Sequence, residues 1–120
     1  MSIDQFFNRT YNRNTYNCAH FVVEVIHRLK GVDISETMRG FLMPPKERTV
    51  RASLRRAFVK LEKPENYCIV LMQRARTTPH VGVYIDGRVL QIHERGVEYV
   101  DLDLASRGFT KTGFYQCLNK

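Results

Sequence analysis

The clearest hydrophobic pattern in the chain predicts a helix near the N-terminus. Between residues 17 and 31, apolar side chains recur at helical spacing, at Cys18, Phe21, Val22, Val25, Ile26 and Leu29. Asn17 is a good N-cap before this pattern, and Gly31 is a good terminator after it. At about 100° per residue, the spacing places Cys18 on the buried stripe of the helix, and His20 and His27 on the opposite, solvent-facing side.

A second amphipathic pattern follows after a break in the chain. Residues 32–47, interrupted by Pro44 and Pro45, are expected to form a loop or a short helical turn. From Arg48 to Leu61 the apolar residues again share one side, at Val50, Leu54, Ala57, Phe58 and Leu61. The other side is basic, so these residues predict a second amphipathic helix.

The second half of the chain has the short apolar and alternating runs that are typical of strands. These runs cover residues 67–72, 80–85, 88–93, 96–102 and 114–118. Asp86-Gly87 separates two of them, and this dipeptide favours a tight hairpin turn. N-terminal helices packed on an antiparallel sheet make an α+β fold, which we expect to form one domain over residues 1–120.

The expected hairpin turn also predicts which residues face each other. If Asp86-Gly87 is a two-residue turn, Val83 lies opposite Leu90 and His80 lies opposite His93. Directly opposed residues have Cβ atoms about 4.5–5.5 Å apart. The two histidines are therefore expected to form a cross-strand pair at one end of the hairpin.

Composition narrows the class of protein. The chain has 120 residues, a length that suits one domain and leaves little room for two. Of these residues 43% are hydrophobic, which is enough for a packed core. No apolar stretch reaches the roughly 18 residues of a membrane span, and residues 1–8 lack the pattern of a signal peptide. The three cysteines Cys18, Cys68 and Cys117 are an odd number, so at least one thiol is expected to be free.

The formal net charge of +7 is concentrated in one segment. Residues 46–63 hold seven basic and two acidic side chains, whereas residues 94–103 are mainly acidic. The basic side is either a solvated helix face or a contact for an anionic partner, with Arg48, Arg51 and Arg55 as its contact residues. Nucleic acid is a poor fit, because aromatic residues that would stack on bases are not interleaved with these arginines.

Cys18 and the histidine pair form a candidate catalytic set. The first turn of a helix stabilises a thiolate through its dipole and its N–H groups, and the same groups can stabilise an oxyanion. One imidazole of the pair can act as a general base while its neighbour fixes its orientation. Gln91 and Glu94 are weaker candidates for that orienting role.

These motifs carry a family resemblance. Tyr-Asn-Cys-Ala-His-Phe-Val at residues 16–22, Pro-His-Val-Gly-Val-Tyr-Ile-Asp-Gly at 79–87 and Gln-Ile-His at 91–93 resemble the NlpC/P60 family. Members of this family are papain-like cysteine peptidases, many of which cut the stem peptides of bacterial peptidoglycan. The resemblance implies that Cys18 is the nucleophile, His80 the general base and His93 the residue that orients His80.

The resemblance also implies a setting and a substrate. It favours a hydrolase that cleaves an amide bond in a peptidoglycan stem peptide, without a cofactor. Tyr11, Tyr16 and Asn17 lie where such folds place substrate-binding or oxyanion groups. Compact members that lack a signal peptide are similar to phage tail-tip proteins and to secreted effectors. We therefore expect synthesis in the cytoplasm, with phage tail proteins or an inhibitor as further partners and delivery to the cell wall by another route.

Other interpretations of the same residues stay open. Cys18 alone could be a small core residue, and Cys68 and Cys117 fit apolar strand patterns. A zinc site from Cys18 and the histidines is a minor alternative, because residues two apart on a helix diverge, and no metal is expected. The chain could also be an assembly module with lost catalysis, or a basic nucleic-acid-binding protein.

Overall fold

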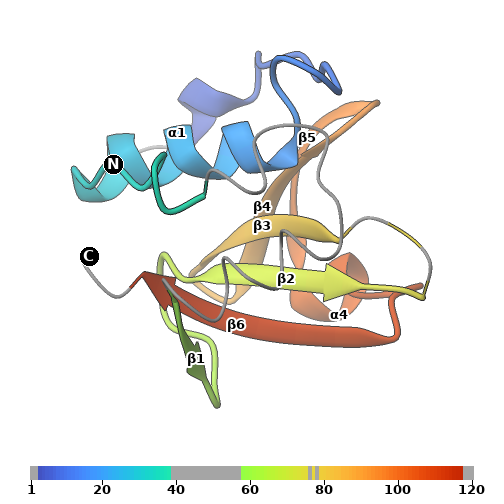
Figure 1. The fold of residues 1–120 in the computed structure, drawn as a ribbon. Coiled ribbons are helices and arrows are strands. Elements are labelled where there is room, and N and C mark those ends of the chain that lie inside the picture. The colour runs from blue at the N-terminus through green and yellow to red at the C-terminus, as the bar shows by residue number, and fades with distance from the viewer. Residues whose placement is uncertain (1–2, 39–57, 76, 78, 118–120) are drawn as a thin grey trace.

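A six-stranded antiparallel sheet and few helices make up the fold, which is of the α+β class (Figure 1). The computed structural model describes residues 3–38, 58–75, 77 and 79–117. The elements are η1 (Asp4–Phe6), α1 (Cys18–Lys30), β1 (Phe58–Leu61), β2 (Ile69–Gln73), β3 (His80–Ile85), β4 (Arg88–His93), β5 (Gly96–Asp101), α4 (Leu102–Ala105) and β6 (Lys111–Cys117). Their order across the sheet is β1-β6-β2-β3-β4-β5.

Helix α1 begins and ends where the sequence predicts. The Asn17 side chain accepts hydrogen bonds from the backbone N–H groups of Ala19 and His20, at 2.9 and 3.2 Å. Gly31 ends the helix with a φ of 74°, a conformation that glycine adopts without strain. His27 is exposed as expected, but His20 is half-buried because its Nδ1 accepts the Asn17 backbone N–H at 3.1 Å.

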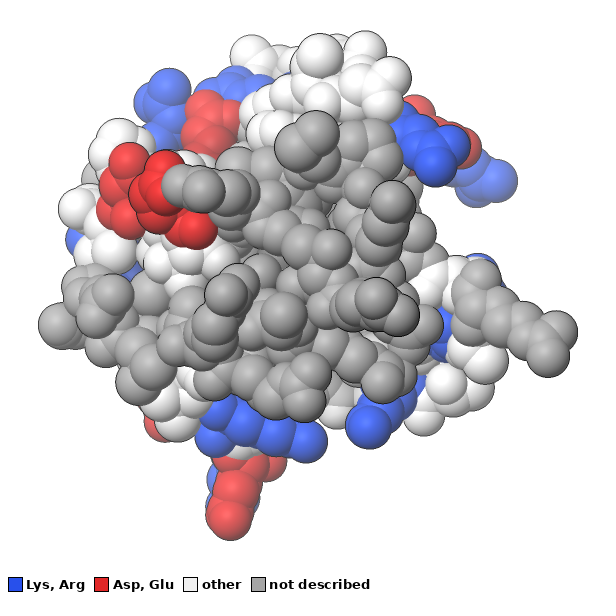
Figure 2. All heavy atoms as spheres, viewed as in Figure 1, with Lys and Arg blue, Asp and Glu red and all other residues white. Residues whose placement is uncertain are grey.

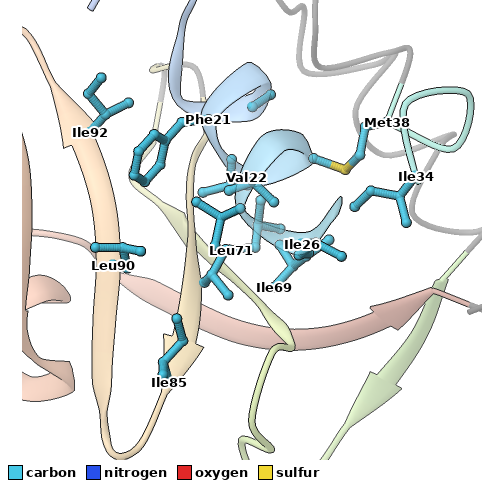
Figure 3. Packing of buried hydrophobic residues seen from close by; sticks show 14 of the residues in the cluster. Phe21, Val22, Ile26, Ile34, Met38, Ile69, Leu71, Ile85, Leu90 and Ile92 are labelled. Atoms are coloured by element: carbon cyan, nitrogen blue, oxygen red, sulfur yellow. The ribbon is translucent and has the colours of Figure 1, made fainter. Parts of the chain in front are cut away.

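The main core lies between α1 and one face of the sheet. Figure 3 shows Phe21 and Val22 of α1 directed at the sheet, near Leu71 and Leu90, and all four are at most 1% exposed. Burying each such side chain stabilises the fold by about 1.5–3 kcal/mol. This packing fixes α1 against β3 and β4, and so holds the start of the helix at the sheet.

The opposite face of the sheet carries a smaller apolar cluster. Val70, Val89 and Ala105 are buried there, and Phe109 packs against them. Side chains alternate along a strand, and Val81 belongs to the core on the α1 face. His80, the first residue of β3, therefore starts on the face away from α1.

The predicted hairpin register is confirmed. Val83 pairs with Leu90 and Ile85 with Arg88, as a two-residue turn requires. Asp86 and Gly87 both have positive φ, at 50° and 88°, which is the backbone of the tight turn that Asp-Gly favours.

The second predicted helix is wrong at its C-terminal end. Phe58–Leu61 form strand β1, which pairs with β6, and Phe58 is buried while Val59 and Lys60 are exposed. Pairing with a distant strand outweighs local helical spacing here. Arg48, Arg51, Arg55 and the rest of that prediction up to residue 57 lie outside the described residues.

The predicted strands are confirmed with small changes at their ends. The run 67–72 is observed as Ile69–Gln73, and the run 114–118 as Lys111–Cys117. The strand predicted over 96–102 ends at Asp101, because Leu102 begins α4. None of the helices in the described part of the chain has the length and apolar character of a membrane span.

Charged side chains of both signs lie on the face seen in Figure 2. The blue and red groups of the described residues there are small and stand apart around the rim. The basic concentration that the sequence predicts falls in residues 46–63, of which only 58–63 are described. Its role as a contact for an anionic partner stays a prediction.

Candidate active site

Cys18 occupies the first position of α1, beside the start of β3. Its side chain is half-buried and packs against the main core. Burial raises the pKa of the Cys18 thiol more than the nearby backbone N–H groups lower it. Burial therefore outweighs the lowering that a helix start provides. The group is a thiol at neutral pH and needs a base to become a nucleophile.

His80 is held between two other rings. Its imidazole stacks on Phe109 with centroids 6.1 Å apart and planes 9° apart, and on His93 at 5.4 Å and 6°. The Arg74 guanidinium lies on Phe109, 5.7 Å from the ring centroid. Burial lowers the pKa of His80 to about 4, so its imidazole is neutral at pH 7 and is a weaker base than an exposed histidine.

Gln91 is the residue that forms a hydrogen bond with His80. Its Oε1 lies 3.0 Å from His80 Nε2, and the Gln91 side chain is 1% exposed. Gly82 leaves room for this contact, since a Cβ there would lie 2.6 Å from the Val89 side chain and 3.3 Å from Gln91 Cβ. Of the candidates for orienting His80, Gln91 therefore makes the polar contact, and His93 covers the ring face.

A carboxylate completes the polar network behind His80. Glu98 Oε1 accepts a hydrogen bond from Gln91 Nε2 at 2.9 Å and lies 2.9 Å from His93 Nε2. These contacts, led by the one with His93, lower the pKa of Glu98, so it is ionised at neutral pH. The network therefore runs from His80 through Gln91 to Glu98, and His93 joins it at the carboxylate.

Cys18 and His80 line the same cleft. Its larger part, of about 480 Å³, is lined by Tyr11, Cys18, His80, Ile92, His93, Glu94, Arg95 and Glu98. A part of about 310 Å³ shares Tyr11, Cys18, His80 and Glu94 and adds Arg13, Asn17 and Pro79. Tyr11 and Asn17 thus line the cleft together with Cys18. Glu94 lines the cleft but makes no polar contact with His80 among those described.

Tyr16 lies elsewhere than predicted. Its hydroxyl donates to Glu24, which also accepts hydrogen bonds from Arg9, at 2.6 and 2.9 Å. Together with His20 it lines a separate pocket along α1 that does not contain Cys18. Because its hydroxyl donates to Glu24 of α1, Tyr16 helps to hold the N-terminal segment on the helix.

Two residues of this site have no counterpart in the sequence predictions. Phe109 comes from the loop between α4 and β6, and no local pattern connects that loop with His80. Glu98 pairs with Gln91 across β4 and β5, and it reaches that place because His93 pairs with Gly96. That register follows from a tight turn at residues 94–95. The sequence indicates this turn, because only two residues separate the predicted strands 88–93 and 96–102.

Comparisons with known proteins place the chain in no family. It has no significant match among protein-family models, curated proteins or solved structures. Among the residues that the structure describes, no three His, Cys, Asp or Glu side chains are grouped to hold a metal ion.

Proposed function

We propose that this protein is a thiol hydrolase with Cys18 as nucleophile and His80 as general base. One observation carries the proposal: a cysteine at a helix start and a buried neutral imidazole line one cleft. The Nε2 of that imidazole is occupied by Gln91, so Nδ1 is the nitrogen left for the thiol. This arrangement matches the requirement of a Cys-His pair for a base with one engaged and one available nitrogen.

The proposed reaction has two stages. His80 Nδ1 takes the thiol proton as Cys18 Sγ attacks an amide carbonyl carbon, and the carbonyl oxygen becomes an oxyanion. The backbone N–H of Cys18, in the first turn of α1, stabilises that charge. The C–N bond then breaks, and His80 returns the proton to the leaving amine. Water, deprotonated by His80, hydrolyses the thioester and regenerates the thiol.

The proposed fold family is NlpC/P60, and the proposed substrate class is a bacterial stem peptide. The order of a nucleophile helix followed by a histidine-bearing hairpin supports the papain-like assignment. The cleft wall carries charges of both signs, from Arg13, Arg95 and Glu94, which suits a peptide with free charged groups. Delivery to the cell wall, in a phage tail or as an effector, belongs to the same proposal.

The reactivity of Cys18 towards iodoacetamide, followed by mass spectrometry of its peptide, tests the catalytic pair. We expect alkylation at pH 7 to fall about 100-fold in His80→Ala, because the thiol loses its base. The matched variant His27→Ala changes an exposed histidine of α1 and leaves the rate unchanged. An equal rate in wild type and His80→Ala rejects the pair.

Digestion of purified peptidoglycan tests the substrate class. Wild-type protein is expected to release cleaved stem peptides, detected by mass spectrometry, and Cys18→Ala none. The second candidate function is an assembly module that keeps the fold without catalysis. The raised pKa of the Cys18 thiol favours it, because an inert buried thiol has the same property. No cleavage together with an unreactive Cys18 establishes that alternative.

A further inference from the structure

A carboxylate lies behind the proposed base, at the far end of its polar network. Glu98 of β5 lies directly opposite Gln91 of β4, and Glu98 Oε1 accepts the Gln91 side-chain N–H at 2.9 Å. Glu98 lines the larger part of the cleft, but its described polar contacts are with Gln91 and His93 and not with Cys18 or His80. Its hydrogen-bonded route to His80 therefore runs through Gln91.

We infer that Glu98 is a positioning residue that sets the tautomer of His80 by orienting the Gln91 amide. An ionised carboxylate only accepts hydrogen bonds, so the amide group facing Glu98 must be the Nε2 donor. Gln91 Oε1 is then the atom that faces His80, and it also only accepts. His80 Nε2 must therefore carry the proton, and Nδ1 keeps the lone pair that a base needs.

Burial makes this orientation matter. Gln91 is 1% exposed, so water cannot satisfy an amide turned the wrong way. His93 lies on the same side, with its Nε2 2.9 Å from Glu98 Oε1 and 3.5 Å from Gln91 Nε2, so Glu98 Oε1 is the acceptor that both side chains face. The other charged side chains that line the cleft with His80 are Arg13, Glu94 and Arg95, and none of them has a described hydrogen bond with His80 or Gln91. Arg74 instead stacks on Phe109. Because Glu98 can only accept, it fixes which end of the Gln91 amide faces His80, and so which ring nitrogen of His80 is protonated.

This inference rests on the proposed function, but its main test does not need a substrate. Long-range ¹H–¹⁵N correlation spectra of uniformly labelled protein report which ring nitrogen of His80 is protonated. We expect the Nε2–H tautomer in wild type. Glu98→Lys replaces an acceptor by a donor, turns Gln91 Oε1 towards position 98, and shifts His80 to the Nδ1–H tautomer. Glu98→Gln, which keeps the side-chain shape, is expected to give a mixture.

Alkylation of Cys18 by iodoacetamide at pH 7 follows the tautomer. We expect a loss of about tenfold in Glu98→Gln and about 100-fold in Glu98→Lys, because the Nδ1–H form has no lone pair for the thiol proton. The matched controls Asp101→Asn and Asp101→Lys make the same charge changes on the same strand, at an exposed residue paired with Arg88. Both controls are expected to keep the wild-type rate and tautomer.

The outcomes separate the two proposals. If His80 keeps the Nε2–H tautomer in both Glu98 variants, with Cys18 rates matching those of the Asp101 variants, the role of Glu98 is overturned. If wild-type Cys18 reacts no faster than in His80→Ala, the proposed hydrolase fails, and the spectra still decide whether Glu98 sets the tautomer. Should Glu98→Lys fail to fold, Glu98→Gln alone decides, since an unchanged tautomer and rate there contradict the inference.

Discussion

Two carboxylates anchor two polar clusters in this protein, and their partners differ in kind. Glu24 of α1 is surrounded by donors that are mostly cationic: Arg9, Arg28 and the Tyr16 hydroxyl. Glu98 of β5 instead meets a neutral amide and an imidazole. The contacts of Glu24 do not extend to the cleft, and they hold the N-terminal segment on α1. The second continues through Gln91 to His80 and the cleft, so a similar carboxylate serves stability in one place and orientation in the other.

The largest expected effect comes from breaking the second cluster at its middle. In Gln91→Leu, His80 Nε2–H loses its acceptor, and the imidazole is free to change tautomer in its buried site. We expect the rate of Cys18 alkylation at pH 7 to fall about 100-fold. The control Gln116→Leu, at an exposed residue of β6, should leave the rate unchanged. A Gln91→Leu rate within twofold of wild type would show that the amide does not orient the base.

Breaking the first cluster should affect stability and leave the reactivity of Cys18 intact. Glu24→Gln removes the charge that three donors share, and we expect a loss of about 2 kcal/mol in the free energy of unfolding at pH 7. Urea denaturation followed by circular dichroism measures it. As a control, Asp101→Asn removes one exposed ion pair and should cost about 0.5 kcal/mol or less. Equal costs in the two variants would contradict the assignment of Glu24 as a structural anchor.

The same variant has a defined pH dependence. Hydrogen bonds from Arg9, the largest cause, lower the pKa of Glu24 from 4.5 to about 2 in the folded protein. A lowered pKa stabilises the fold above the unfolded value near 4.5, and this stabilisation is lost as the pH falls towards 2. We expect the difference between wild type and Glu24→Gln to be largest above pH 5 and to shrink below pH 4. A pH-independent difference would mean that the charge is not its cause.

The smallest expected effect concerns the ring stack rather than the polar chain. Phe109→Leu keeps an apolar side chain but removes the flat face against His80, an interaction of about 1 kcal/mol. We expect Cys18 alkylation to fall about three- to fivefold while the His80 tautomer stays unchanged. Phe7→Leu, at an exposed phenylalanine, is the control. A changed tautomer in Phe109→Leu would show that stacking and hydrogen bonding act together.

The sequence predicts the parts of this site that depend on residues close together in the chain, and not those that depend on distant residues. Cys18 at the helix start follows from the Asn17 cap and the spacing after it, both within one turn. The contact between His80 and His93 is one that the Asp-Gly turn predicts, and the observed register pairs the three residues on each side of that turn. The contact of Tyr16 with Glu24 is not predictable in this way, because Glu24 lies two turns along α1 and no local pattern selects it as the partner. Strand β1 was missed for a similar reason, since its partner β6 is more than 50 residues away.

The sequence by itself determined helix α1, the β3–β4 hairpin and the choice of Cys18, His80 and His93 as candidate site residues. It could do so because capping, periodicity and turn chemistry act between neighbouring residues. Tertiary structure decided which side chain touches His80 and what lies behind it. The loop after α4 brings Phe109 to the ring, and the pairing of β4 with β5 brings Glu98 to Gln91. It also decided the protonation of the pair, because burial raises the pKa of Cys18 and lowers that of His80. Burial depends on the whole packed chain, and no segment contains that information alone.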